Sequence, residues 1–96
     1  MSDNDYFIIL DYCKNEIKQE KDPMIRKGII KYYKKIRLHF FKLLCNKIKF
    51  SKNIIENQKK IFNINNWDKV QKNISDNQMN IIMCEKKLNL LEEYFH

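Results

Sequence analysis

The sequence predicts an all-α protein, a bundle of three to four helices with one long, basic central helix. Apolar residues recur every three or four positions in each long segment, and nothing alternates with the period of two that a strand requires. The sequence shows neither an internal repeat nor a flexible linker. Its 96 residues have the length of one small domain, and we expect residues 1–96 to form a single helical domain.

The first predicted helix covers about residues 4–21. Ser2 or Asp3 is the expected N-cap, and the acidic residues near the start favour the positive end of the helix dipole. Its apolar positions share one face: Tyr6, Ile9, Leu10, Cys13 and Ile17. Asp22 precedes Pro23, and a proline at the first helical position loses no hydrogen bond. A second helix should therefore begin at this pair.

The second predicted helix is the longest and runs from Pro23 to about Phe50, roughly 40 Å at 1.5 Å per residue. Its apolar stripe contains Ile25, Ile29, Tyr32, Tyr33, Ile36, Phe40, Leu43, Leu44 and Ile48. Gly28 weakens the helix near its start and leaves room for another backbone to approach. Residues 25–63 carry twelve basic residues and one acidic residue, Glu56. The candidate basic face consists of Lys27, Lys31, Lys34, Lys35 and Lys42.

A shorter third helix is expected to follow the basic helix. Ser51 is a suitable N-cap, and the apolar pattern then continues to Phe62. Residues 63–66 include three asparagines and are the best candidate for a loop. Residues 67–73 fit either a helical turn or coil.

The last predicted helix covers about residues 76–95. Ser75 and Gln78 form the S-x-x-Q pattern of a capping box directly before an apolar-periodic run. This helix is apolar on two faces, and one face is enough to close the bundle. The other face predicts a partner, because large exposed apolar patches are rare on monomers. The expected interface residues are Ile82, Met83, Leu90 and Tyr94.

Catalytic, metal and membrane functions have no pattern in this sequence. A single glycine excludes a P-loop and a dinucleotide fingerprint, and His39 has no nearby acid to orient it as a general base. The three cysteines are far apart and lack zinc-ligand spacing: Cys13, Cys45 and Cys84. We therefore expect no enzyme activity, no cofactor and no metal. The cysteines should be buried in a protein of a reducing compartment, neither secreted nor membrane-bound.

The basic segment allows three interpretations. The mildly acidic ends, residues 1–24 and 64–96, can fold back over it, or it can contact phosphates, or it can lie on an anionic membrane. Only two of its twelve cations are Arg, the residue that reads guanine edges, so we expect at most weak, non-specific contact with nucleic acid. Packing in a helical bundle is favoured over a membrane surface because the flanking amphipathic helices offer a protein core.

Two stretches resemble the helical A domain of GINS-complex subunits, and the Sld-type subunit most of all. Residues 29–38 place Tyr33, Arg37 and Leu38 in the Y-x-x-x-R-L pattern of that domain's central helix. The order of an acidic helix, a long basic helix, a lysine-rich connection and a capped last helix is also similar.

The second resembling stretch is residues 74–79, which is similar to the L-S-x-x-E-L start of the family's last helix. Ser75 matches that pattern, whereas Gln78 stands where Glu is usual and Asp76 where Pro is frequent. The Sld-type helical domain precedes a small β domain, and we expect none in this protein.

The resemblance implies a non-catalytic scaffold of DNA replication in the nucleus. GINS subunits assemble in fours and join the replicative helicase to a Cdc-type partner, so the implied partners are sister subunits and helicase components. The alternatives are a small basic helical protein associated with nucleic acid or the ribosome, and a small helical-hairpin assembly factor of an organelle.

Overall fold

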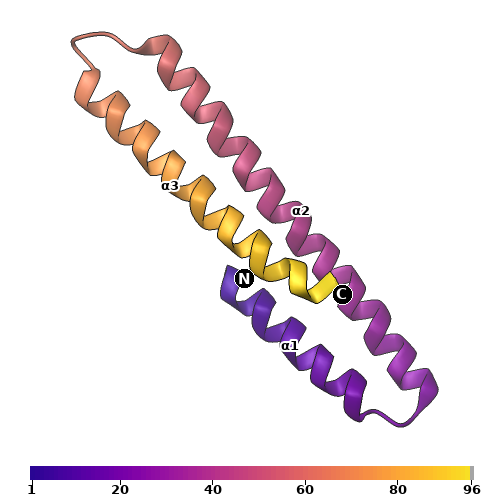
Figure 1. Ribbon diagram of the computed structural model, residues 1–96. Helices are drawn as coiled ribbons and strands as arrows, with labels where there is room; N and C mark the ends of the chain where they lie inside the picture. The colour runs from indigo at the N-terminus through magenta and orange to yellow at the C-terminus, as the bar shows by residue number, and fades with distance from the viewer. Residues whose placement is uncertain (96) are drawn as a thin grey trace. The chain divides into compact units, whose positions relative to one another are not determined.

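The computed structural model describes residues 1–95, which are all-helical and contain no strand (Figure 1). The elements are α1 (Asp3–Gln19), α2 (Pro23–Ile61), α3 (Trp67–Glu92) and the short 3-10 turn η1 (Glu93–Phe95). The predicted all-α class is therefore confirmed, with three α-helices in the described part of the chain.

The starts of α1 and α2 follow local capping rules. Ser2 and Asp5 form a capping box, in which the Ser2 N–H donates to Asp5 Oδ2 at 2.9 Å and the Asp5 N–H donates to Ser2 Oγ at 3.4 Å. The Met24 N–H donates to Asp22 Oδ1 at 2.9 Å, which caps the helix that opens at Pro23. Both predicted starts are confirmed, with Ser2 as the cap of α1.

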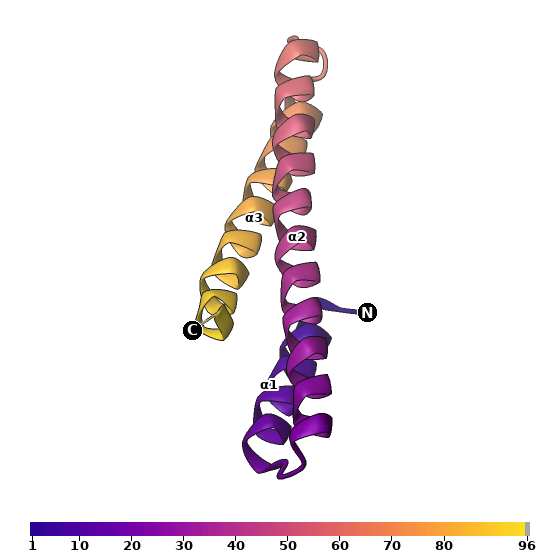
Figure 2. The same ribbon diagram turned by 90° about the vertical axis from the view of Figure 1, so that its right-hand side faces the viewer.

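Helix α2 is a single helix of 39 residues (Figure 2), so the prediction of a separate third helix beginning at Ser51 is wrong. Ser51 lies inside the helix and is only 5 % exposed. A serine caps the start of a new helix only when its own backbone leaves the helical conformation. Here no Gly or Pro interrupts the chain between Phe50 and Ile61, and packing in the interior outweighs the capping preference.

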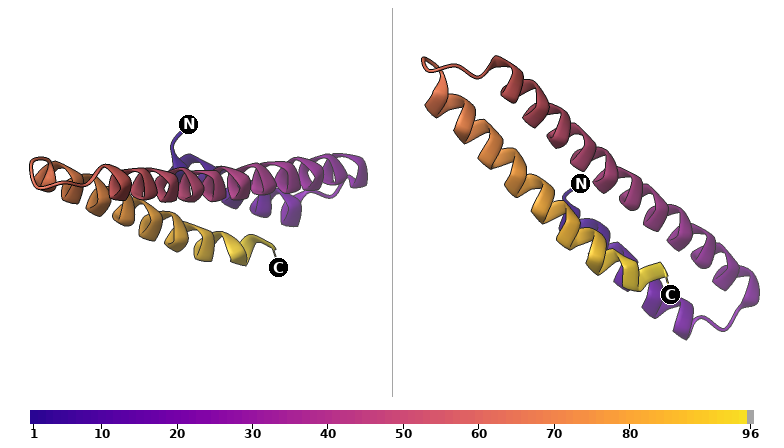
Figure 3. Two further views of the ribbon diagram at one scale, coloured as in Figure 1. Left: turned by 90° about the horizontal axis from the view of Figure 1, so that it is seen from above. Right: turned by 45° about the horizontal axis from the view of Figure 1, so that its top comes forward.

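The loop between α2 and α3 is confirmed at residues 63–66 (Figure 3) and is stabilised by its asparagines. The Asn65 and Asn66 N–H groups donate to Asn63 Oδ1 at 2.9 and 3.1 Å. The Asn63 N–H donates to Asn66 Oδ1 at 2.8 Å, and Asn66 Nδ2 donates to the Ile61 carbonyl at 2.8 Å. The bond to the Ile61 carbonyl satisfies a backbone oxygen that the end of α2 leaves unpaired, and the other three hold the N–H groups of the loop.

Helix α3 begins at Trp67, about two and a half turns before the predicted start at residue 76. The capping box predicted at Ser75 and Gln78 is therefore wrong, because both residues lie inside α3 and are exposed. Residues 67–73, which fitted either helix or coil, are helical. The apolar pattern is weak here, but Val70 is 2 % exposed and packs this first part of the helix into the interior.

The chain divides into two compact units, and the first contains residues 1–42 with the stretch from Leu90 onward. Its core is largely aromatic. The Tyr6 and Phe40 rings stack with centroids 4.6 Å apart, and Phe7 meets the edge of Phe40 at 5.1 Å. The buried residues of this unit are Tyr6, Leu10, Cys13, Tyr33, Phe40 and Leu91.

The second unit is a helical hairpin of Leu43–Asn89, made by the later part of α2 and most of α3. Its interior is thin and mostly aliphatic, with Leu44, Ser51, Ile55, Val70 and Cys84 buried. Asn73 Nδ2 donates to Gln58 Oε1 at 3.4 Å and links the two helices. Cys84 here and Cys13 in the first unit are buried as expected, whereas Cys45 is half-buried.

Candidate functional site

Side chains from α2 hold the C-terminal turn of the first unit. Tyr33 Oη and Arg37 Nη1 both donate to the carbonyl oxygen of Tyr94, each at 2.7 Å. Two donors use both lone pairs of this oxygen. The structure thus places Tyr33 and Arg37 in contact with Tyr94. The sequence analysis grouped the first two as a family motif and assigned Tyr94 to a partner interface. Leu38, the third motif residue, is exposed.

Tyr94 is also held through its ring and hydroxyl. Tyr94 Oη donates to Asp11 Oδ1 at 2.6 Å, and the Lys14 ammonium lies 5.0 Å from the ring centroid. Burial, reinforced by the hydrogen bond to Asp11, raises the pKa of Tyr94 to about 12. Tyr94 is half-buried and uses its polar groups within this unit, so it differs from the freely exposed interface residue that the sequence predicted.

Arg37 completes the same cluster. Its guanidinium carbon lies 4.2 Å from the Phe95 ring centroid and 5.4 Å from that of Tyr33. Its buried Nε has no hydrogen-bond partner within residues 1–95. Burial raises the pKa of Tyr33, partly offset by the nearby Arg37 charge. The raised pKa values keep both tyrosines protonated, so both hydroxyls are hydrogen-bond donors in this cluster.

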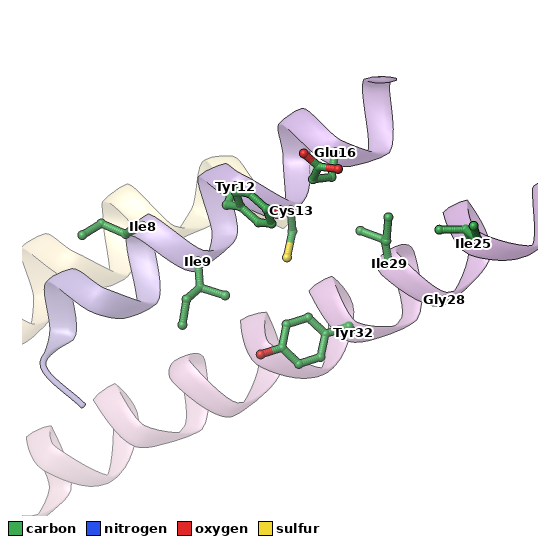
Figure 4. Close-up of a pocket in the computed structure, with 9 residues that line it drawn as sticks. All are labelled: Ile8, Ile9, Tyr12, Cys13, Glu16, Ile25, Gly28, Ile29 and Tyr32. Carbon is green, nitrogen blue, oxygen red and sulfur yellow. The ribbon is translucent and has the colours of Figure 1, made fainter. Parts of the chain in front are cut away.

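A groove of about 660 Å³ opens between α1 and the first part of α2, within the first unit (Figure 4). It is lined by Ile8, Ile9, Tyr12, Cys13 and Glu16 from α1 and by Ile25, Gly28, Ile29 and Tyr32 from α2. Four of these side chains remain largely exposed, Ile8 at 65 %, Tyr12 at 64 %, Ile25 at 53 % and Tyr32 at 48 %. The groove is therefore apolar and open to solvent.

Two small residues line the groove, one on each wall. Cys13 is short, and Gly28 has no side chain. A Cβ atom added at Gly28 would meet nothing within 4 Å. The expectation that another backbone approaches Gly28 is therefore wrong for residues 1–95, and the space stays open. The sequence signal was this single glycine beside a bulky apolar stripe.

The candidate basic face lies on α2 and is accessible. All five of its lysines are exposed: Lys27, Lys31, Lys34, Lys35 and Lys42. Within residues 1–95 none of the five forms an ion pair, so the acidic residues of the two ends do not pair with these lysines. Farther along α2, Lys59 pairs locally with Glu56 at 3.8 Å.

The expected interface residues are mostly exposed. In the second unit Ile82 and Met83 are 46 % and 48 % exposed, and Met79, one turn earlier on the same face, is 56 % exposed. In the first unit Leu90 is 57 % exposed. These side chains are the largest apolar groups that the described part of α3 leaves in contact with water, together with Trp67 at its start.

The described residues contain neither a metal-binding group nor a membrane span. Within 1–95, no three His, Cys, Asp or Glu side chains lie close enough together to hold an ion. None of the described helices is both long and apolar enough to cross a bilayer. His39 is exposed, and its ring lies 5.9 Å from that of Tyr6, which is a packing contact.

Comparison with protein-family models, with curated proteins and with solved structures finds no match to this chain. The resemblance to GINS subunits therefore stays a prediction that rests on the motif residues themselves.

Proposed function

We propose that this protein is a non-catalytic scaffold subunit that binds a partner protein through the exposed apolar face of α3. The observation that carries the proposal is the exposure of Met79, Ile82 and Met83 on one face of the second unit. Fully burying a side chain of this size contributes about 1.5–3 kcal/mol, and each of these three has about half of its surface still to bury. Such a face is stabilised by a partner.

The narrower proposal is that the partners are sister subunits of a GINS-like complex that supports the replicative helicase in the nucleus. It is supported by the Y-x-x-x-R-L pattern of Tyr33, Arg37 and Leu38. The contact of Tyr33 and Arg37 with Tyr94 gives that pattern a structural role in this chain. Co-expression with candidate sister subunits tests it, since a co-purifying complex of fixed stoichiometry is the expected result.

The scaffold proposal is tested with the double substitution Ile82→Asp and Met83→Asp. We expect the unmodified chain to self-associate when isolated, because the apolar face lacks its partner, and the double variant to sediment as a monomer with nearly unchanged helix content. The matched control is Asn53→Asp with Asn57→Asp, which makes the same charge change at exposed positions of α2. Sedimentation velocity and circular dichroism measure the two properties.

A monomeric unmodified chain, indifferent to the Ile82 and Met83 substitutions, would contradict the scaffold proposal. Loss of self-association in the asparagine control as well would show that charge, and not the apolar face, governs association.

A second candidate is a small nucleic-acid- or ribosome-associated protein. The observation that favours it is the accessible lysine face of α2, which has no ion pairs within residues 1–95. Tight binding to nucleic acid would also need exposed aromatic rings beside the lysines, and Tyr32 and Phe41 are 48 % and 42 % exposed.

A further inference from the structure

We infer that the groove between α1 and α2 binds an amphipathic helix of another protein, with the helix's apolar residues in the groove and its acidic residues against a row of lysines on α2. This surface belongs to the first unit and is separate from the α3 face on which the proposed scaffold function rests.

The dimensions of the groove match a helix. Its walls are residues 8–16 of α1 and residues 25–32 of α2, each a little over two helical turns and about 12 Å long. That length accommodates apolar side chains at positions i, i+3 or i+4, and i+7 of a bound helix, which is the spacing used when a helix docks in a groove.

The lining favours a helix over a small polar ligand. The walls are aliphatic and aromatic apart from Glu16 and the two tyrosine hydroxyls. Small-molecule sites usually enclose most of their ligand, whereas Ile8, Tyr12 and Ile25 are each more than half exposed. An open apolar trough needs an occupant that brings its own polar outer face, as an amphipathic helix does.

The lysines of α2 determine which charge the bound helix should carry on the side that faces α2. Lys27, Lys31 and Lys35 follow one another at four-residue spacing, so they form a row along α2. Lys31 is three residues after Gly28, and Lys35 is three residues after Tyr32, which places these two lysines beside the groove wall, whereas Lys27 lies farther round the helix. All three lysines are exposed and have no ion pair within residues 1–95. The complementary flank of the bound helix is acidic.

The α1 wall of the groove carries a negative charge, opposite in sign to that of the lysines on α2. Glu16 is the charged residue that lines the groove, and it comes from α1. A bound helix with acidic residues toward α2 and a basic residue toward Glu16 is therefore favoured in one orientation. A two-fold dimer centred on the groove would crowd two lysine rows into one interface.

The test uses the full chain and a fluorescent synthetic peptide of about four to five helical turns. The peptide carries Leu at the anchor positions, Glu on one flank and Lys on the other, and a second peptide has Lys on both flanks. We expect binding by fluorescence anisotropy, about tenfold or more tighter for the first peptide at low salt, with the difference shrinking as salt is added.

Variants of the chain locate the peptide. Gly28→Trp, which fills the groove, and Ile25→Asp, which makes an exposed wall residue polar, should each weaken binding about tenfold or more. Gly28→Ala is the matched control and should leave binding within about twofold. Replacing Lys27, Lys31 and Lys35 by Gln should weaken binding and flatten its salt dependence. The same change at the exposed Lys49, Lys52 and Lys60 should do neither.

Several results would overturn the inference. These are no binding of the first peptide, equal binding of both peptides, and binding that survives both Gly28→Trp and Ile25→Asp. Dimerisation of the unmodified chain that Gly28→Trp abolishes would assign the groove to a second copy. Binding to anionic vesicles that Gly28→Trp abolishes would assign it to a membrane. The Ile82→Asp, Met83→Asp variant changes the α3 face and should still bind the peptide. Failure of the scaffold proposal can therefore be distinguished from failure of this inference.

Discussion

At the scale of single residues, the main feature is the attachment of the C-terminal turn to the first unit. Tyr94 receives two hydrogen bonds on its carbonyl oxygen and donates one from its hydroxyl to Asp11. These partners are 57 to 83 residues away along the chain. Tyr94 therefore joins α1 and α2 to the end of the chain, and its protonation state bears on stability.

The raised pKa of Tyr94 predicts a loss of stability at high pH. Its ordinary value is 10.0 and its value in the folded protein is about 12, so the folded state holds the proton more tightly than the unfolded state does. The stabilisation that depends on this proton is fully present below pH 10 and is lost as the pH rises toward about 12.

Urea unfolding of the unmodified chain and of Tyr94→Phe measures this effect. Near neutral pH the variant should be less stable by about 0.5–1.5 kcal/mol, because it lacks the hydrogen bond to Asp11. The difference should shrink across pH 10 to 12, where the unmodified chain alone loses this contribution. Tyr12→Phe, at a largely exposed tyrosine, is the control. A difference that stays constant with pH would contradict the assignment.

At the scale of elements, α2 determines what each unit contains. It contributes its first part to the unit with the groove and its later part to the hairpin with α3. Its continuity through Ser51 follows from burial, and its weakest position is Gly28, because glycine in a helix has the largest conformational freedom to lose on folding.

Gly28→Ala should stabilise the protein. Alanine is favoured over glycine in a helix interior by about 0.8–1 kcal/mol, and the added Cβ meets nothing within 4 Å at this position. The midpoint of urea unfolding should rise while its slope stays constant. A destabilised variant would show that Gly28 is closely approached by another part of the protein, which would also contradict the open groove.

At the scale of the whole molecule, the net charge of +7 predicts electrostatic attraction to polyanions. The cations are mostly Lys and lie along a helix whose apolar stripe contributes to both cores, so we expect duplex DNA to bind weakly and without sequence preference. Binding should be lost near physiological salt, because it depends on counterion release.

Anisotropy titrations with two unrelated duplexes at several salt concentrations measure this prediction. Replacing Lys27, Lys31 and Lys35 by Gln should reduce the salt slope by up to about three, in proportion to the phosphate contacts removed. A tight, salt-resistant complex with one DNA or RNA sequence would instead favour the nucleic-acid-associated function over the scaffold.

The sequence alone determined the all-α class, the starts of α1 and α2, and the loop at residues 63–66. These features depend on groups within about four residues of one another. Ser2 with Asp5 and Asp22 with Pro23 are local capping signals, and the asparagines of the loop bond to each other. Periodicity needs no knowledge of what a helix packs against.

Only the tertiary structure decided where the later helices begin and what the candidate residues do. Ser51 and Ser75 are equally good caps in the sequence, yet both lie within helices, because packing of Ile55 and Val70 in the interior stabilises helix on both sides of the loop. The contacts of Tyr94 and the groove beside Gly28 join residues far apart in the chain. Such contacts depend on which helix faces meet, and a pattern with a period of three or four residues carries no information about that pairing.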